Sequence, residues 1–167
     1  MVDMELIGVR MELPTNTPVM LLRELGGARR VLPIYIDHVE ARAIQFGIDA
    51  VVTPRPLTHD LFVDALGALG TSLQRLLITE LRENPTGGTF IAELELATPS
   101  GVLRVSSRPS DGVALAVRTG APISADETVL DRAAAPAIDE EEDGDDEEIV
   151  DQFREFLDDV NPEDFAS

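Results

Sequence analysis

The sequence contains no cysteine, no lysine and no tryptophan. Without cysteine, the chain can form neither a disulfide framework nor a thiolate metal site. No apolar run approaches the roughly 18 residues that a membrane-spanning helix needs. The first ten residues, MVDMELIGVR, are acidic and lack the apolar stretch of a secretory signal peptide. These absences predict a cytoplasmic protein that is not inserted in a membrane.

Charge is distributed unevenly along the 167 residues, whose formal net charge is −19. Residues 131–167 contain 16 acidic residues and 2 arginines, whereas residues 1–130 contain 16 acidic residues and 11 arginines. A chain of this length suits one domain with an appendage. We therefore expect a mildly acidic body over residues 1–133, followed by a strongly acidic tail.

Apolar spacing and turn residues predict the elements of the body. Strands are expected at 3–13, 18–25, 28–36, 73–83, 89–97 and 102–107, and helices within 37–52, 57–70 and 109–120. In the second helix, one apolar side is formed by Leu61, Phe62, Ala65, Leu66 and Leu69. Two β-β-β-α units joined by a linking helix indicate an α+β domain, with a mostly antiparallel sheet and packed helices.

The tail divides into two parts. Residues 134–148 form a low-complexity acidic segment that is expected to be disordered, because its charges repel one another and it has little to bury. Residues 149–167 differ, since Ile149, Phe153, Phe156, Leu157 and Val160 recur at near-helical spacing. This pattern predicts an amphipathic helix, which could dock on the chain's own arginines or on a protein partner with an apolar groove.

Two similar segments, RPLTHD (55–60) and RPSD (108–111), each precede an expected helix. Helix capping explains part of the pattern. Thr58 or Asp60 could cap the second helix, Ser110 could cap the third, and Asp37 could cap the first. Gly120 would end the third helix.

Capping requires neither the arginines nor the histidine of these segments. Arg55 and Arg108 could pair with Asp111 and Asp60 across the two turns, or they could bind a phosphate, which guanidinium groups and helix N-termini both favour. His59 is the candidate general acid or base, because histidine titrates near neutral pH. We expect all five side chains to converge on one face.

Three blocks of the sequence resemble a known family. LPIYIDHVEARAIQFGI (32–48), PRPLTHDLF (54–62) and RPSDGVALAVRTGAPI (108–123) are similar to the signature blocks of the bifunctional nuclease (BFN) domain family of bacteria and plants. The resemblance covers roughly residues 3–130, and 54–60 match the family pattern without a change. Gly112 replaces an alanine of that pattern, and Ser106 stands where the family commonly has an aspartate.

The resemblance implies cleavage of DNA and RNA. Phosphodiester hydrolysis needs an activated water, a cation on the phosphate and an acid for the leaving group. The catalytic candidates are His59, Asp60 and Asp111, the substrate-binding candidates are Arg55, Thr58, Arg108 and Ser110, and Glu40, Asp60 and Asp111 could hold one Mg²⁺ or Mn²⁺.

Other functions stay open at this point. The motifs could be structural in a regulatory or adaptor module, or the arginine-rich pocket could bind a nucleotide or another phosphate ligand as a sensor. Because the body is net negative, any nucleic-acid face must be local. The candidate arginines for it are Arg29, Arg30, Arg55, Arg75, Arg108 and Arg118. Sheet edges favour a homo-oligomer, and the apolar runs at 19–22 and 75–78 could be either core strands or such an interface.

Overall fold

The computed structural model describes residues 1–84 and 87–136, which form one seven-stranded sheet and four helices. In chain order the elements are β1 (Val2–Glu12), β2 (Thr17–Glu24), β3 (Val31–Tyr35), α1 (His38–Ile48), α2 (Thr58–Ala68), β4 (Ser72–Asn84), β5 (Gly87–Thr98), β6 (Gly101–Ser107), α3 (Pro109–Thr119), β7 (Ile123–Ala125) and α4 (Glu127–Ala133). This order confirms the α+β class and both predicted β-β-β-α units.

The sheet joins the two units through a short strand that sequence analysis missed. Its order is β3-β2-β1-β7-β4-β5-β6, so β7 lies between the two three-stranded meanders. β7 pairs antiparallel with β1 and parallel with β4, whereas the other neighbours are antiparallel. The mostly antiparallel sheet is therefore confirmed, and one parallel contact is added.

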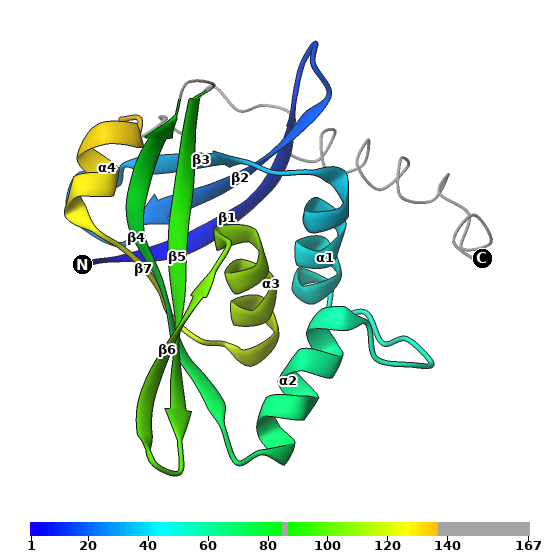
Figure 1. Ribbon diagram of the computed structural model, residues 1–167. Helices are drawn as coiled ribbons and strands as arrows, with labels where there is room; N and C mark the ends of the chain where they lie inside the picture. The colour runs from blue at the N-terminus through cyan, green and yellow to red at the C-terminus, as the bar shows by residue number, and fades with distance from the viewer. Residues whose placement is uncertain (85–86, 137–167) are drawn as a thin grey trace.

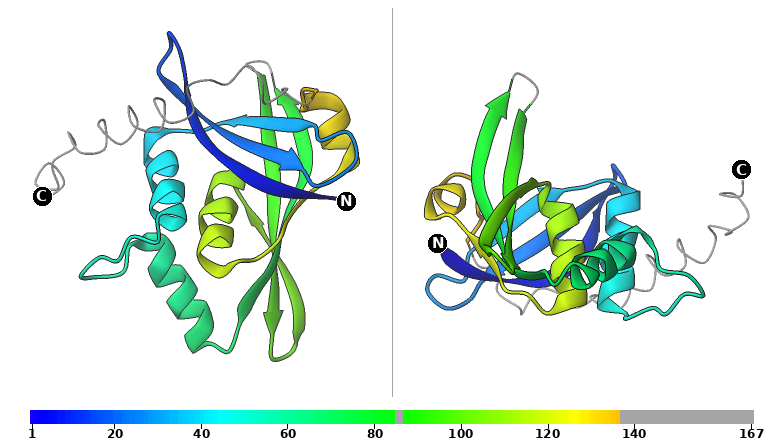
Figure 2. Two further views of the ribbon diagram at one scale, coloured as in Figure 1. Left: turned by 180° about the vertical axis from the view of Figure 1, so that it is seen from behind. Right: turned by 60° about the horizontal axis from the view of Figure 1, so that its bottom comes forward.

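α3 forms the centre of the helical layer. It contacts β4 and β5 and is flanked by α1 and α2 (Figure 1; Figure 2). Its residues 112–116 are buried between the sheet and the neighbouring helices. A Cβ built on Gly112 would lie 2.3 Å from Cδ1 of the fully buried Leu76, so α3 approaches β4 closely at this glycine. The sheet thus fixes the position of α3, and of its first turn, closely.

The two apolar runs that could be core or interface are core. Met20, Leu22, Leu76 and Ile78 are 0% exposed and belong to one hydrophobic cluster beneath the helices. Burial of such side chains supplies most of the driving force for folding. These runs are therefore not available to a partner.

Most of the apolar side of α2 that the sequence predicted is not buried in the fold. Leu61, Phe62 and Leu69 are exposed, and α2 has no fully buried residue, although Leu66 packs partly against the core. The reason is position, because α2 contacts α3 and β4 but does not lie flat on the sheet. Helical spacing identified the apolar side correctly, but the fold leaves that side largely uncovered.

α4 packs against β3 and β4, and the segment after it pairs with the start of β3. Asp126 caps α4 by accepting a hydrogen bond from the Thr128 amide at 3.0 Å, and Val129 and Leu130 are buried. Val31 and Ala135 then exchange backbone hydrogen bonds of 3.0 and 2.8 Å. Backbone pairing thus continues two residues beyond the predicted end of the body at Ala133.

Some predictions fall outside the described residues. The acidic linker from residue 137 onward and the amphipathic helix expected within 149–167 both lie there. Within the described part of the chain, no helix combines the length and the apolar composition needed to cross a membrane.

Candidate active site at the starts of two helices

The first turn of α3 presents a charged pair. Arg108 is the N-cap residue, with an extended backbone at φ −75° and ψ 145°, and Pro109 begins the helix. Proline suits the first helical position because its φ is already helical and it has no amide hydrogen to leave unpaired. Ser110 is therefore not the cap as predicted, and it is buried. Asp111, at the third helical position, forms an ion pair with Arg108.

The first turn of α2 is built differently. Leu57 is the N-cap residue, and its backbone amide donates a hydrogen bond of 3.0 Å to Asp60 Oδ2. Asp60 therefore satisfies the free amide at this end from inside the first turn, whereas Thr58 is exposed. The cap predicted for α1 is also not made by a side chain, although Asp37 occupies the N-cap position.

The two helix starts meet through His59 and Asp111. His59 Nε2 lies 3.5 Å from Asp111 Oδ1. Arg108 donates to both oxygens of Asp111, from Nε at 2.7 Å and from Nη2 at 3.0 Å, and its Nη1 donates to Glu40 Oε1 at 2.7 Å. Side chains from α1, α2 and α3 thus form one group, Glu40, His59, Arg108 and Asp111, which we call the Arg108 cluster.

Asp60 belongs to a second, separate ion pair. Its Oδ1 accepts a hydrogen bond of 2.6 Å from Arg118 Nε, and Arg118 Nη1 donates at 2.8 Å to the backbone carbonyls of Ala43 and Ala114. The Arg118 side chain is only 10% exposed. This pair fastens α2 to α1 and α3 and leaves little of the arginine accessible to a ligand.

The predicted pairs across the two turns are wrong. Arg108 reaches the aspartate three residues along its own helix, and Asp60 is held by Arg118 instead. Arg55 is exposed, and its guanidinium makes no polar contact with the described residues. Three of the five residues expected to converge, His59, Arg108 and Asp111, are therefore in contact through their side chains.

Hydrogen bonds from arginine determine the ionisation of both aspartates. The Arg108 guanidinium lowers the pKa of Asp111, and His59 adds to this effect against the opposing effect of burial. Arg118 lowers the pKa of Asp60 in the same way, helped by the Leu57 amide. In turn, Asp111 and Glu40 raise the pKa of Arg108. Both carboxylates are thus ionised at neutral pH and accept protons poorly.

The predicted metal ligands do not assemble. Over residues 1–84 and 87–136, no group of three His, Asp or Glu side chains is arranged to hold a metal ion. Asp60 is committed to Arg118, and the cation shared by Glu40 and Asp111 is the Arg108 guanidinium. Glu40 Oε2 is buried without a hydrogen-bond partner. One free carboxylate oxygen does not make a site for a divalent ion, which takes several oxygen ligands.

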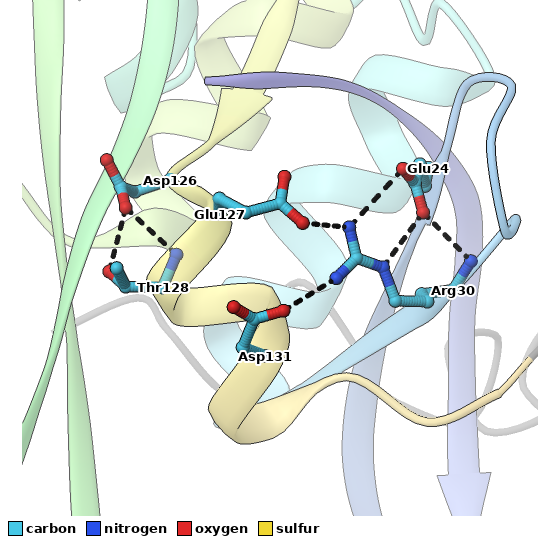
Figure 3. Close-up of polar contacts among 6 residues, drawn as sticks. All are labelled: Glu24, Arg30, Asp126, Glu127, Thr128 and Asp131. Carbon is cyan, nitrogen blue, oxygen red and sulfur yellow. Dashed lines mark hydrogen bonds and ion pairs between the residues drawn. The ribbon is translucent and has the colours of Figure 1, made fainter.

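Four of the six arginines expected to form a local basic face, Arg30, Arg75, Arg108 and Arg118, are paired with carboxylates. Arg30 binds Glu24, Glu127 and Asp131, which ties α4 to the β2–β3 turn (Figure 3). Arg75 pairs with Asp3 at 3.2 Å. Positive charge that ligands could reach is therefore local, at Arg108, whose side chain is 63% exposed, and at the exposed Arg55.

Two hollows adjoin Arg108. One, of about 360 Å³, lies toward β3 and α1 and is lined by residues that include Tyr35, Glu40 and Ser110. The other, of about 640 Å³, lies between α2, β5 and β6 and includes His59 and Asp111. The second hollow is also lined by apolar residues, among them Phe62 of α2 and Val105 of β6. Sequence analysis missed this part, because nothing in the sequence brings these two residues together.

The chain belongs to the bifunctional nuclease domain family, because the model of that domain matches residues 20–137. Two relatives are the uncharacterized proteins MT1877 of Mycobacterium tuberculosis strain CDC 1551 / Oshkosh and Rv1829 of strain ATCC 25618 / H37Rv. Each is 44% identical to this chain over 169 residues, which cover 99% of the chain and 98% of the relative. The family predicted from the three sequence blocks is thereby confirmed.

Proposed function

We propose that this protein is a nuclease that hydrolyses phosphodiester bonds of DNA and RNA at the Arg108 cluster. The observation that carries the proposal is the contact of His59 with the Arg108–Asp111 pair, which joins a proton acceptor to an exposed cation. Membership of the family supports the same class of reaction. The order of the two motifs in the chain would not by itself bring these groups together.

Arg108 would bind the phosphate. A guanidinium has five N–H groups, and three of those on Arg108 are used by Asp111 and Glu40. Two N–H groups therefore remain for a phosphate oxygen, on a side chain that is 63% exposed. Positive charge at this point would stabilise the negative charge on the phosphoryl oxygens in the transition state.

His59 would activate the water. Its Nε2 faces Asp111, so Nδ1 is the nitrogen that can accept a proton. A water oxygen would attack phosphorus while its proton passes to Nδ1, and the bond from phosphorus to the leaving oxygen would break. The leaving oxygen would take a proton from solvent. Asp111, ionised at neutral pH, would orient the imidazole and stabilise the imidazolium, as the carboxylate of a catalytic triad does.

A divalent ion is a second arrangement, which the donor set supports less well. It would have to replace the Arg108 guanidinium between Glu40 and Asp111. We therefore assign no step to a metal, and we expect cleavage to persist in EDTA. Loss of cleavage in EDTA, with recovery on addition of Mn²⁺, would favour the metal arrangement.

The chain offers a matched pair of histidines for the test. His59 lies in the Arg108 cluster, whereas His38 lies in the first turn of α1 and is not a member of that cluster. We expect His59→Ala to lower cleavage of single-stranded DNA and RNA by about 10²- to 10⁴-fold, the usual contribution of a general base. His38→Ala should cleave at the wild-type rate. Equal activity of both variants and the wild type would contradict the proposal.

A homo-oligomer also remains a proposal. β6 is an edge strand of the sheet, and Val102 and Leu103 on it are 63% and 52% exposed. Exposed edges with apolar side chains favour pairing with a second copy. Sedimentation velocity of the wild type and of Val102→Arg would show whether this edge is an interface.

A further inference from the structure

The larger hollow beside Arg108 is an apolar groove with one polar end. Its walls and floor come from four elements, through Phe62 of α2, Phe90, Ile91 and Leu94 of β5, Val105 of β6 and Leu115 of α3. His59, Arg108 and Asp111 lie at its polar end, together with the hydroxyl residues Thr58, Ser106 and Ser107. Its volume of about 640 Å³ lies in the range of small-molecule sites.

Strand register explains how the groove forms. Leu94 pairs with Val105 and Leu96 with Leu103, and paired residues of antiparallel strands face the same side. Because Leu94 and Leu96 are buried under the helices, the groove side of β6 carries Val105 and Leu103. At the far end α2 approaches the β5–β6 turn, where a Cβ on Gly70 would lie 3.6 Å from Pro99. The segment after α2 thus lies near the β5–β6 turn, and Phe62 of α2 is 43% exposed.

We propose that this groove is a base-binding subsite, which takes an unstacked nucleobase of the nucleotide whose phosphate lies at Arg108. The proposal rests on the proposed function and names its substrate class, single-stranded nucleic acid. A base within a duplex is stacked on both faces and cannot enter a groove without being extruded. The groove therefore favours single strands, loops and ends over paired segments.

The chemistry of the lining fits a base. Flat aromatic rings stack well on phenylalanine, and such stacking tolerates every base because each has a π face. Phe62 and Phe90 supply aromatic surface. Arg108 lines both this groove and the smaller hollow toward β3 and α1. The hydroxyls of Thr58 and Ser107 can both donate and accept hydrogen bonds, so they would not select one base.

Three small probes separate base, sugar and phosphate: adenosine 5′-monophosphate, ribose 5-phosphate and inorganic phosphate. Calorimetry on the full chain should show the first binding about tenfold or more tighter than the other two. Phe62→Ala should remove this difference, and Phe62→Trp should keep it. The control is Leu61→Ala, because Leu61 is 57% exposed on the same helix but does not line the groove. It should behave as the wild type.

Adenosine monophosphate binding no tighter than ribose 5-phosphate would overturn the base subsite. It would also be overturned if Phe62→Ala dissociated an oligomer in sedimentation without changing the preference for adenosine monophosphate, because the groove would then be covered by a second copy. The two proposals fail separately. If the protein prefers adenosine monophosphate through Phe62 but cleaves no nucleic acid, the base subsite stands and the nuclease proposal is wrong. If cleavage depends on His59 but adenosine monophosphate is not preferred, the nuclease proposal stands and the base subsite is wrong.

Discussion

Two Arg–Asp pairs, Arg118–Asp60 and Arg108–Asp111, each hold an aspartate at the start of a helix, but their arginines differ in position and in exposure. Asp60 and Asp111 both occupy the third position of a helix that follows an Arg-Pro segment. Arg118 is 10% exposed and also binds two backbone carbonyls, whereas Arg108 is 63% exposed and has N–H groups to spare. The first pair joins three helices, and the second faces the hollows.

The comparison shows that a local motif does not determine the role of its residues. In α2 the aspartate bonds the backbone of its own first turn and an arginine from α3. In α3 the aspartate accepts hydrogen bonds from the arginine of its own N-cap through both oxygens, and its Oδ1 also lies near His59. We infer that the α2 pair is structural and that the α3 pair, with His59, carries the function.

The largest expected effect on stability follows from removal of Arg118. Arg118→Gln would leave a partly buried carboxylate and two carbonyls without their donor, at a cost of about 2–4 kcal/mol in the free energy of unfolding. Arg108→Gln should cost less than about 1 kcal/mol, because exposed ion pairs contribute little. Urea denaturation of both variants measures the difference. Equal losses would remove the distinction between the two pairs.

A smaller effect concerns pH. The pKa of Asp60 is lowered in the folded state, chiefly by Arg118, from an ordinary value of 3.8. A carboxyl whose pKa is lowered by folding stabilises the fold fully at pH values above its pKa in the unfolded state. This stabilisation is lost as the pH falls through its pKa in the folded state. We expect the free energy of unfolding to decrease as pH falls below 3.8, and to decrease by less in Asp60→Asn.

Asp64→Asn is the control for the pH measurement. Asp64 lies on the same helix, is exposed, and forms no hydrogen bond or ion pair with the described residues. Its variant should show the wild-type decrease. If Asp60→Asn and Asp64→Asn respond alike in urea titrations between neutral pH and about pH 3, the Arg118–Asp60 pair does not stabilise the fold.

Strong local signals explain which parts of the fold could be predicted. Alternating strands, turn residues and helix starts identified six strands and three helices, and Gly120 ends α3 in the left-handed conformation as expected. β7 and α4 are three and seven residues long, too short for periodicity to identify them. The cap at Asp126 was a usable signal for α4.

The candidate site could be predicted only in part, because its contacts join distant residues. The residue types were available from the sequence, and His59, Arg108 and Asp111 do meet. The partner of each aspartate could not be predicted from the sequence. Asp60 and Arg118, for example, are 58 residues apart, and no local pattern pairs them. The exposed side of α2 was missed for the same reason, because burial depends on where the helix lies relative to the sheet.

The most direct measurement compares cleavage by Asp111→Asn and Asp60→Asn on one single-stranded substrate, at a temperature where both variants remain folded. Asp111→Asn should lower kcat by about tenfold to hundredfold, because His59 loses the carboxylate that orients it. Asp60→Asn should keep kcat near the wild-type value and lose about 1–2 kcal/mol of stability, the scale of a lost helix cap. Equal losses of kcat in the two variants, or a loss confined to Asp60→Asn, would contradict the assignment of function to the Arg108 cluster.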